Sequence, residues 1–225
     1  MRFRGFLNEL TSVYGAGITF IDIDETIFRT FAMIKVMKDG NEIKKLNNQE
    51  YNTYKLKPGE NFDYGEFRDS EFFNKTSIPI PQTIKRIKKM VAGIKKKESN
   101  SKIIFLTARA DFVDKEPFLN TFRKYGIPID DIYVERAGNL KGTVAGVKKQ
   151  VIMKYLGSGQ YRRVRMIDDD MTNVNEFLKI EKELPQAIID KIKQTYNIPE
   201  DEKFPVIQFF GLLVLKNGSL KRIGE

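Results

Sequence analysis

Apolar residues fall into two alternating patterns along the chain. Near-continuous apolar runs, typical of strands covered on both faces of a sheet, occupy residues 18–23, 103–106, 132–134 and 164–167. Apolar residues at helical spacing occupy residues 81–97, 115–125, 143–156 and 173–180. Because strand and helix alternate four times, the sequence predicts an α/β fold with a doubly wound, mainly parallel sheet.

The chain between the first two strands predicts an insertion. Asp39 and Gly40 stand between two β-compatible runs, which predicts a β-hairpin flap projecting from the end of the first strand. Residues 47–77 are rich in aromatic side chains without a clean period, and we expect an irregular lid or side layer packed on that hairpin. We therefore expect the insertion to span about residues 31–77.

The ends of the chain predict additions to this core rather than a second domain. An apolar pattern within residues 1–16 predicts a short helix. A C-terminal extension is expected over about 181–225, with a helix near 185–196 and an apolar segment turned at Asn217 and Gly218, which leaves open an extra edge hairpin. With 225 residues, 41% of them hydrophobic, we expect the whole chain to form a single domain.

The chain contains neither cysteine nor histidine, which excludes several kinds of site. Disulfides, thiolate nucleophiles, cysteine-ligated metals and imidazole bases are ruled out, which leaves carboxylates, lysines, hydroxyls and an oxygen-ligated ion such as Mg²⁺. No apolar run approaches the length of a membrane span, so we expect a cytoplasmic protein without a membrane partner. A net charge of +9 favours a polyanionic partner.

Polar residues follow the strands at their carboxyl ends, where ligands bind in sheets of this kind. Asp22 interrupts the first apolar run, and a carboxylate beside a sheet interior requires a cation or hydrogen-bond donors. A divalent metal would supply the charge, and a spacing of two residues places Asp22 and Asp24 on the same side of the strand tip. The other strands end at Thr107, Arg109, Arg136, Asn139, Asp168 and Asp169. Together they predict one site, although the first strand alone is also compatible with an acidic turn.

The order of these residues resembles the motifs of the haloacid dehalogenase (HAD) superfamily of phosphotransferases. The match within residues 17–180 comprises Asp22 and Asp24, Thr107, Lys148, and Asp168 with Asp169. The resemblance implies a Rossmann-like, HAD-like fold and Mg²⁺-dependent phosphomonoester hydrolysis through an aspartyl-phosphate. The chain is also similar to phage-borne members and to members acting on polynucleotide ends, which implies the host cytoplasm as the location of a phage-encoded protein.

The resemblance implies a role for each matching residue. Asp22 would attack phosphorus, and Asp24 would protonate the leaving oxygen and later accept a proton from water. Mg²⁺ would be held by Asp22, the main-chain carbonyl of Asp24, and Asp168, with Asp169 assisting through a metal-bound water. The phosphoryl oxygens would be held by Thr107 and Lys148.

Two positions fit the family pattern less closely. Lys148 lies three and four residues before apolar positions of its helix, which points it toward the sheet, but Lys149 and Lys141 remain alternatives. Glu25 stands where the family most often has glycine, which we interpret as subfamily variation.

The resemblance also implies an accessible site, because the insertion leaves little room for a large cap. Bulky phosphorylated substrates, among them nucleic-acid ends and nucleotides, would then be admitted. The predicted substrate contacts are Arg109, Arg136 and Asn139. Salt bridges to Asp111 or Glu135 are the alternative role of these side chains. The lysine-rich face of residues 81–97 predicts either a solvated surface or one that faces nucleic acid.

Two other classes of protein are weighed against a phosphatase. A receiver-type signalling domain uses similar residues, but its phosphoacceptor aspartate ends a middle strand, whereas here the middle strand ends in Thr107. A non-catalytic structural or nucleic-acid-binding protein on the same fold, such as a phage component, is the stronger alternative, because a fold does not determine a function.

Overall fold

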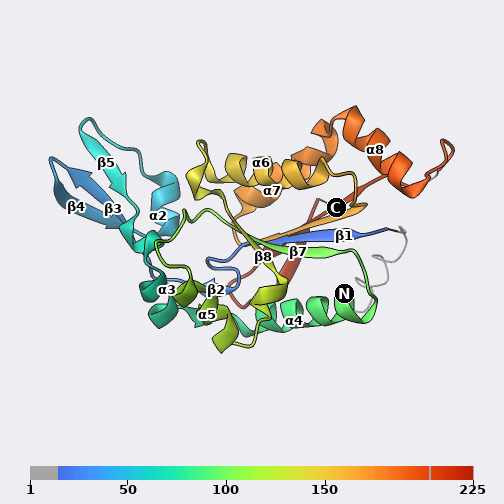
Figure 1. The fold of residues 1–225 in the computed structure, drawn as a ribbon. Helices are drawn as coiled ribbons and strands as arrows, with labels where there is room; N and C mark the ends of the chain where they lie inside the picture. Colours follow the sequence, from blue (N-terminus) through green and yellow to red (C-terminus); the bar gives the residue numbers. More distant parts are fainter. Residues whose placement is uncertain (1–14, 203, 225) are drawn as a thin grey trace.

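A six-stranded sheet forms the centre of the molecule in a computed structural model that describes residues 15–202 and 204–224 (Figure 1). The strand order is β11 (Leu220–Ile223), β10 (Gln208–Val214), β9 (Arg163–Asp168), β1 (Gly17–Ile21), β7 (Lys102–Thr107) and β8 (Tyr133–Arg136). Every neighbouring pair is parallel except β10 and β11, which are antiparallel. The predicted mainly parallel sheet is therefore confirmed, while the helix predicted within residues 1–16 falls on residues outside the described part.

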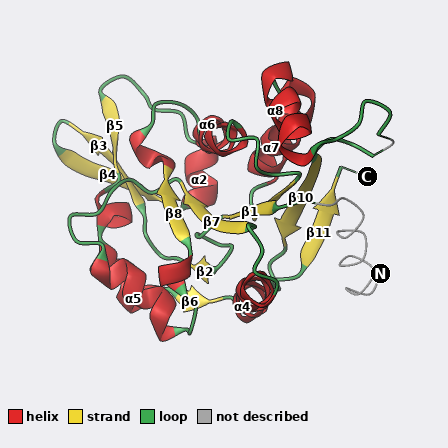
Figure 2. Cartoon of the chain, turned by 45° about the vertical axis from the view of Figure 1, so that its right-hand side comes forward, coloured by secondary structure: helices red, strands yellow, loops and turns green. Residues whose placement is uncertain are grey.

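Helices cover both faces of this sheet (Figures 1 and 2). One face carries α4 (Pro81–Lys96) and α5 (Glu116–Lys124), and the other carries α6 (Val144–Leu156), α7 (Met171–Glu183) and α8 (Gln186–Tyr196). Phe20 belongs to the core under α6 and α7, whereas its neighbour Ile21 belongs to the core under α4 and α5, and both are fully buried. Burial on both faces explains the near-continuous apolar run of the first strand.

The helices near the carboxyl ends of the strands begin at side chains that cap them. The hydroxyl of Thr143 accepts a hydrogen bond from the N–H of Gly146 at the start of α6. The carboxylate of Asp170 accepts one from the N–H of Thr172 at the start of α7, directly after β9. These caps fix where α6 and α7 begin relative to the strand ends.

The insertion after β1 is a small sheet of its own. Its order is β4 (Asn41–Leu46), β3 (Ile34–Lys38) and β5 (Glu60–Asp63), all antiparallel. The predicted hairpin is confirmed, and Asp39 and Gly40 turn it with positive φ angles of 51° and 79°. Where the insertion leaves and rejoins the main domain, β2 (Phe28–Arg29) pairs with β6 (Ile78–Pro79).

The irregular structure predicted for residues 47–77 is wrong in part. Besides β5, this stretch forms α2 (Asn48–Thr53), the 3₁₀ helix η1 (Gly65–Arg68) and α3 (Ser70–Thr76). Its aromatic residues are divided between two cores, because Tyr51 and Phe62 pack in the insertion while Phe73 packs in the main core. A stretch that serves two cores has no single apolar period.

The C-terminal segment completes the sheet. β10 adds a parallel strand beside β9, and β11 forms the extra edge hairpin that the sequence left open, turned at Gly218 with φ of 76°. Two further 3₁₀ helices, η2 (Ile129–Asp131) and η3 (Ala137–Asn139), flank β8. Within the described residues, every helix is too short or too polar to cross a bilayer.

Candidate active site

Three carboxylates converge at the carboxyl ends of β1 and β9. Asp22 follows β1 directly, and its N–H donates to the carbonyl of Ile167 over 2.9 Å, which extends the pairing of the two strands. Asp168 is the last residue of β9, and Asp169 follows it. One carboxylate oxygen of each of the three lies within 4.8 Å of the other two. The arrangement could therefore bind a metal ion.

Lys148 on α6 lies against two of these carboxylates. Its Nζ donates to Asp22 Oδ1 over 2.5 Å and to Asp168 Oδ2 over 2.8 Å, and the residue is only 3% exposed. The alternative Lys149 instead forms an ion pair with Glu183 near the surface, and Lys141 is exposed. Of the three lysines considered from the sequence, the structure brings Lys148 to the acidic residues.

Asn173 is a member of the site that the sequence did not predict. Its Nδ2 donates to Asp168 Oδ1 over 3.0 Å, and the main-chain N–H of Asp170 donates to the same oxygen over 2.9 Å. Asp168 is thus held by donors on both of its oxygens. The available signal was a polar residue on the buried face of a helix, since Asn173 shares that face with Val174 and Phe177.

Asp22, Asp168 and Asp169 together carry more negative charge than Lys148 can balance, and this excess shifts the pKa values of the site. Burial, together with the neighbouring carboxylates, raises the pKa of Asp22 well above its ordinary value despite Lys148. Asp169 is more exposed than the other two, yet the partial burial of its carboxyl and the neighbouring Asp168 carboxylate raise its pKa to about 7. Burial opposes the charge on Lys148, yet the two carboxylates outweigh it and raise the pKa of Lys148.

The donor set fits a hard divalent cation. Three carboxylates face one ammonium group, so negative charge remains in excess. Oxygen ligands from carboxylates are those that Mg²⁺ and Ca²⁺ prefer, and a second positive charge would offset the repulsion that raises the pKa of Asp22.

Asp24 has a different set of partners from Asp22. Arg109 Nη2 donates to Asp24 Oδ1 over 2.7 Å and Nε to Oδ2 over 3.1 Å, and the hydroxyl of Thr30 donates to Oδ1 over 2.8 Å. Burial alone would raise the pKa of Asp24, but the Arg109 guanidinium and these hydrogen bonds lower it below its ordinary value. Among the described residues, the close carboxylate group consists of Asp22, Asp168 and Asp169, and Asp24 is outside it. Any contact of Asp24 with a metal through its main-chain carbonyl stays a prediction.

Arg109, predicted as a substrate contact, is buried and already has partners within the protein. Its guanidinium carbon lies 4.8 Å from the ring centre of Phe67 and 4.7 Å from that of Phe73, and Nη1 donates to the Phe67 carbonyl over 3.0 Å. Thr107, fully buried, accepts the N–H of Arg109 over 3.1 Å and lies 3.4 Å from Asp24 Oδ2. The other two predicted substrate contacts, Arg136 and Asn139, both bind Asp111, over 2.7 Å in each case.

The loop after β1 explains the position of Glu25. The carbonyl of Ile23 accepts the N–H groups of Ile27 and Phe28, so the chain turns sharply there and β1 ends before the predicted Ile23. Glu25 has a φ of 57°, a conformation that favours glycine. Its carboxylate accepts the N–H of Thr30 over 2.9 Å, which helps to hold a residue with a side chain in this conformation.

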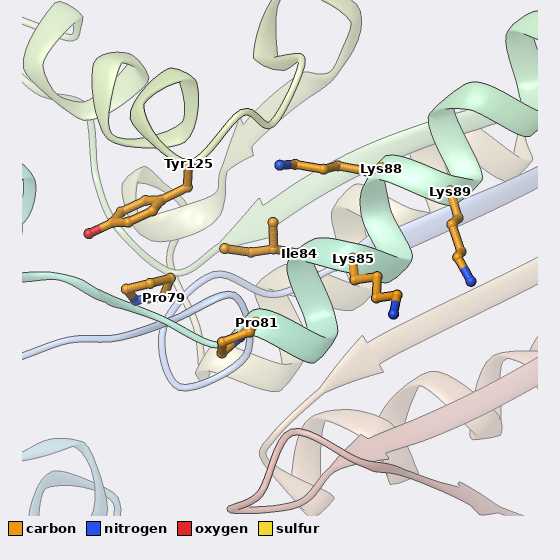
Figure 3. Close-up of a pocket in the computed structure, with 7 residues that line it drawn as sticks. All are labelled: Pro79, Pro81, Ile84, Lys85, Lys88, Lys89 and Tyr125. Carbon is orange, nitrogen blue, oxygen red and sulfur yellow. The ribbon is translucent and has the colours of Figure 1, made fainter.

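The acidic group opens into a cavity of about 600 Å³ between the main domain and the insertion. Asp22, Asp169 and Lys148 line this cavity together with aromatic and apolar residues. Its other polar and charged lining residues are Asp24, Glu25, Arg68, Arg109, Asp170 and Asn173. A second hollow of about 440 Å³ lies on α4 and shares no lining residue with the first. Figure 3 shows its residues: Pro79, Pro81, Ile84, Lys85, Lys88, Lys89 and Tyr125.

No model of a known protein family matches the chain, and no curated protein matches it either. The protein combines a mainly parallel α/β sheet with a close group of carboxylates, of which Asp22 and Asp168 are buried.

Proposed function

We propose that the protein is a Mg²⁺-dependent phosphatase of the haloacid dehalogenase type, which hydrolyses phosphomonoesters. The observation that carries this proposal is the contact of one buried ammonium group, Lys148, with carboxylates at the ends of two neighbouring strands, Asp22 and Asp168. Both strand ends open into one cavity, where a phosphate ester can meet these groups.

Mg²⁺ would be held by Asp22, Asp168 and Asp169, the three carboxylates with oxygens in reach of one another. When bound, it would supply the positive charge that lets a phosphate dianion approach a carboxylate. Lys148 would contribute the second positive charge, and its two ion pairs hold it at this position before substrate arrives.

Asp22 is the proposed nucleophile. One of its oxygens would form a bond to phosphorus while the ester P–O bond breaks, and the leaving oxygen would take up a proton. Water would then attack phosphorus, release inorganic phosphate and restore the Asp22 carboxylate. Lys148 binds Asp22 through Oδ1, which fixes the carboxylate and leaves Oδ2 for the attack.

Asp24 is the proposed acid and base of these two steps. Its ion pair with Arg109 favours the carboxylate form, which suits acceptance of a proton from water in the second step. Donation to the leaving oxygen in the first step requires the protonated form, so Arg109 must yield part of its contact before Asp24 can act as an acid.

Hydrolysis of p-nitrophenyl phosphate tests the proposal. We expect turnover that needs Mg²⁺, stops with EDTA and is abolished in Asp22→Asn, while Asp190→Asn on the exposed face of α8 keeps the full rate. Turnover that survives in Asp22→Asn, or that ignores EDTA, would exclude this mechanism.

The second hollow, which lies on α4 and is lined by three lysines, favours nucleic-acid binding as a second candidate function. Figure 3 shows Lys88 on the side of Tyr125, with Lys85 and Lys89 pointing to the other flank. Within the described chain these three lysines form no ion pair, so their charge is available to phosphates. Binding of a single-stranded oligonucleotide at low salt should weaken when all three are changed to glutamine. Unchanged binding, or binding without salt dependence, would refute this function.

A further inference from the structure

The cavity above the acidic group has an aromatic wall, made of Tyr51, Tyr64 and Phe67 of the insertion. Apolar side chains of the main domain, Leu140 and Met171, line the same cavity. Both remain partly solvent-exposed, at 44% and 38%, so they are available to contact a ligand. The cavity thus offers charged as well as apolar and aromatic side chains to a ligand.

Contacts within the insertion fix the aromatic wall. The hydroxyls of Tyr51 and Tyr64 are hydrogen-bonded over 2.9 Å, and both rings pack on Phe62, at centre-to-centre distances of 4.9 and 6.0 Å. Phe67 is linked to Asp24 through Arg109, because the carbonyl of Phe67 accepts a hydrogen bond from Arg109, which itself binds Asp24. A wall ordered before binding loses little entropy when a ligand packs on it.

The chemistry of the wall selects a planar ring system. Aromatic faces bind flat rings by stacking, and every nucleic-acid base offers such a flat face. The cavity of about 600 Å³ lies within the range of roughly 300–1,000 Å³ that suits small organic ligands. Arg68 at the edge of the wall adds a positive charge and five donors.

We propose that the substrate is a phosphomonoester with an aromatic ring system, of the nucleoside monophosphate class. Its base packs on Tyr51, Tyr64 and Phe67, and its phosphate lies at the end with Asp22 and Lys148. This inference rests on the proposed phosphatase function and adds the substrate class and the residues that select it.

A matched pair of esters tests the inference. AMP and ribose 5-phosphate both carry the phosphate on the primary 5′ oxygen of a ribose and differ in the base at C1′, so a difference in kcat/KM between them reports on the base. We expect kcat/KM of the natural protein to favour AMP by about tenfold or more, a ratio equivalent to about 1.4 kcal/mol. Calorimetry with Asp22→Asn and Mg²⁺ should show the same preference in binding, without turnover.

Substitutions assign the preference to the wall. Tyr51→Leu should lower the ratio of kcat/KM for AMP to that for ribose 5-phosphate most of the way to one. Tyr54→Leu is its matched control, because Tyr54 packs on Phe62 in the same module but does not line the cavity. Leu140→Gln, at a partly exposed position of the cavity lining on the main domain, should lower the AMP preference without disturbing the fold.

The possible outcomes separate the two proposals. Equal kcat/KM for AMP and ribose 5-phosphate would overturn the substrate class and leave the phosphatase standing. AMP binding without Mg²⁺-dependent turnover of any ester would overturn the phosphatase and support the aromatic subsite. A strong preference for a 5′-phosphorylated oligonucleotide over AMP would replace the mononucleotide with a nucleic-acid end.

Discussion

Arg109 binds the carboxylate of Asp24 through two nitrogens, from a position with only 2% of its surface exposed. The same guanidinium contacts the rings of both Phe67 and Phe73. One side chain therefore joins the loop after β1, the end of β7 and the insertion. The proton equilibrium of Asp24 and the position of the aromatic wall depend on the same residue.

Arg109→Met should destabilise the protein strongly. The substitution leaves the carboxylate of Asp24, whose side chain is only 14% exposed, without its main partner. Loss of one partner of a buried ion pair costs roughly 3–5 kcal/mol of folding stability. We expect the low end of that range in urea unfolding at neutral pH with EDTA. Because the pair lowers the pKa of Asp24, its stabilisation exists above the ordinary carboxyl pKa and is lost as pH falls through the lowered value. The difference between natural protein and variant should therefore shrink in acid.

The double variant Arg109→Met/Asp24→Asn is the control for this effect. Removing the charge of Asp24 removes the penalty of leaving it unpaired, so the double variant should be more stable than Arg109→Met alone. A double variant with the sum of both losses would mean that the ion pair has no coupling energy.

Magnesium should stabilise the folded protein through the acidic group. A ligand that binds only the native state adds about 2.7 kcal/mol at a concentration one hundred times its Kd. We expect Mg²⁺ to raise the melting temperature, and Asp168→Asn to abolish this rise because it removes a charged ligand. Asp190→Asn should retain the full rise. An equal rise in both variants would place the ion elsewhere.

Lys148→Met should be much less stable than the natural protein in EDTA. The change leaves Asp22 and Asp168 close together without the ammonium group between them. Mg²⁺ should restore part of the stability, since it supplies positive charge to the same carboxylates. Both effects are measurable by urea unfolding with and without the ion.

Lys149→Met is the matched control, one residue along α6. Lys149 pairs with Glu183 at the surface, and surface pairs contribute about 0–1 kcal/mol. If Lys149→Met lost more stability and activity than Lys148→Met, the choice of Lys148 as the phosphate-binding lysine would be wrong.

Gly138→Ala should disturb the site through the backbone. A Cβ atom at this position would lie 2.2 Å from the carbonyl oxygen of Ala108 and 2.7 Å from the carbonyl carbon of Arg109, so η3 and the loop after β7 must move apart. Overpacking of this kind costs typically about 1–3 kcal/mol, and we expect activity to fall as Arg109 shifts. Thermal unfolding and phosphatase rates measure the two effects.

Gly93→Ala provides the opposite case. Gly93 lies within α4 with open space around its Cβ position, so alanine should stabilise the helix by roughly 0.5–1 kcal/mol. If Gly138→Ala changed the free energy of unfolding by the same amount as Gly93→Ala, the close backbone approach at Gly138 would have no energetic consequence.

The sheet and the acidic group could be predicted because their signals are local. The strand before Asp22 is apolar because both faces of β1 are covered. The neighbouring strand β9, which ends in Asp168, is covered in the same way. The carboxyl ends of parallel strands meet at one edge, so sequence order alone places these residues together. Lys148 was favoured by its position three and four residues before the buried Val151 and Ile152, but the sequence left Lys149 and Lys141 open as alternatives.

The contacts of Asp24 could not be predicted from local patterns. Its spacing from Asp22 indicates the same side of a strand, but β1 ends at Ile21 and the chain turns at Ile23, so the rule of alternating sides no longer applies. The choice of Arg109 as its partner depends on Phe67 and Phe73, which reach the site through long-range packing. Asn173 was missed because a single polar residue on a buried helix face has many possible explanations.

The two-residue pairing of β2 with β6 brings the exit and return of the insertion side by side. Because both junctions lie together, the module between them can be lengthened, shortened or exchanged without separating the strands that carry the carboxylates. A graft at residues 30 and 77 would also replace Phe67 and Phe73, which contact Arg109, so an exchanged module keeps the surroundings of Asp24 only if it retains aromatic side chains at these two positions.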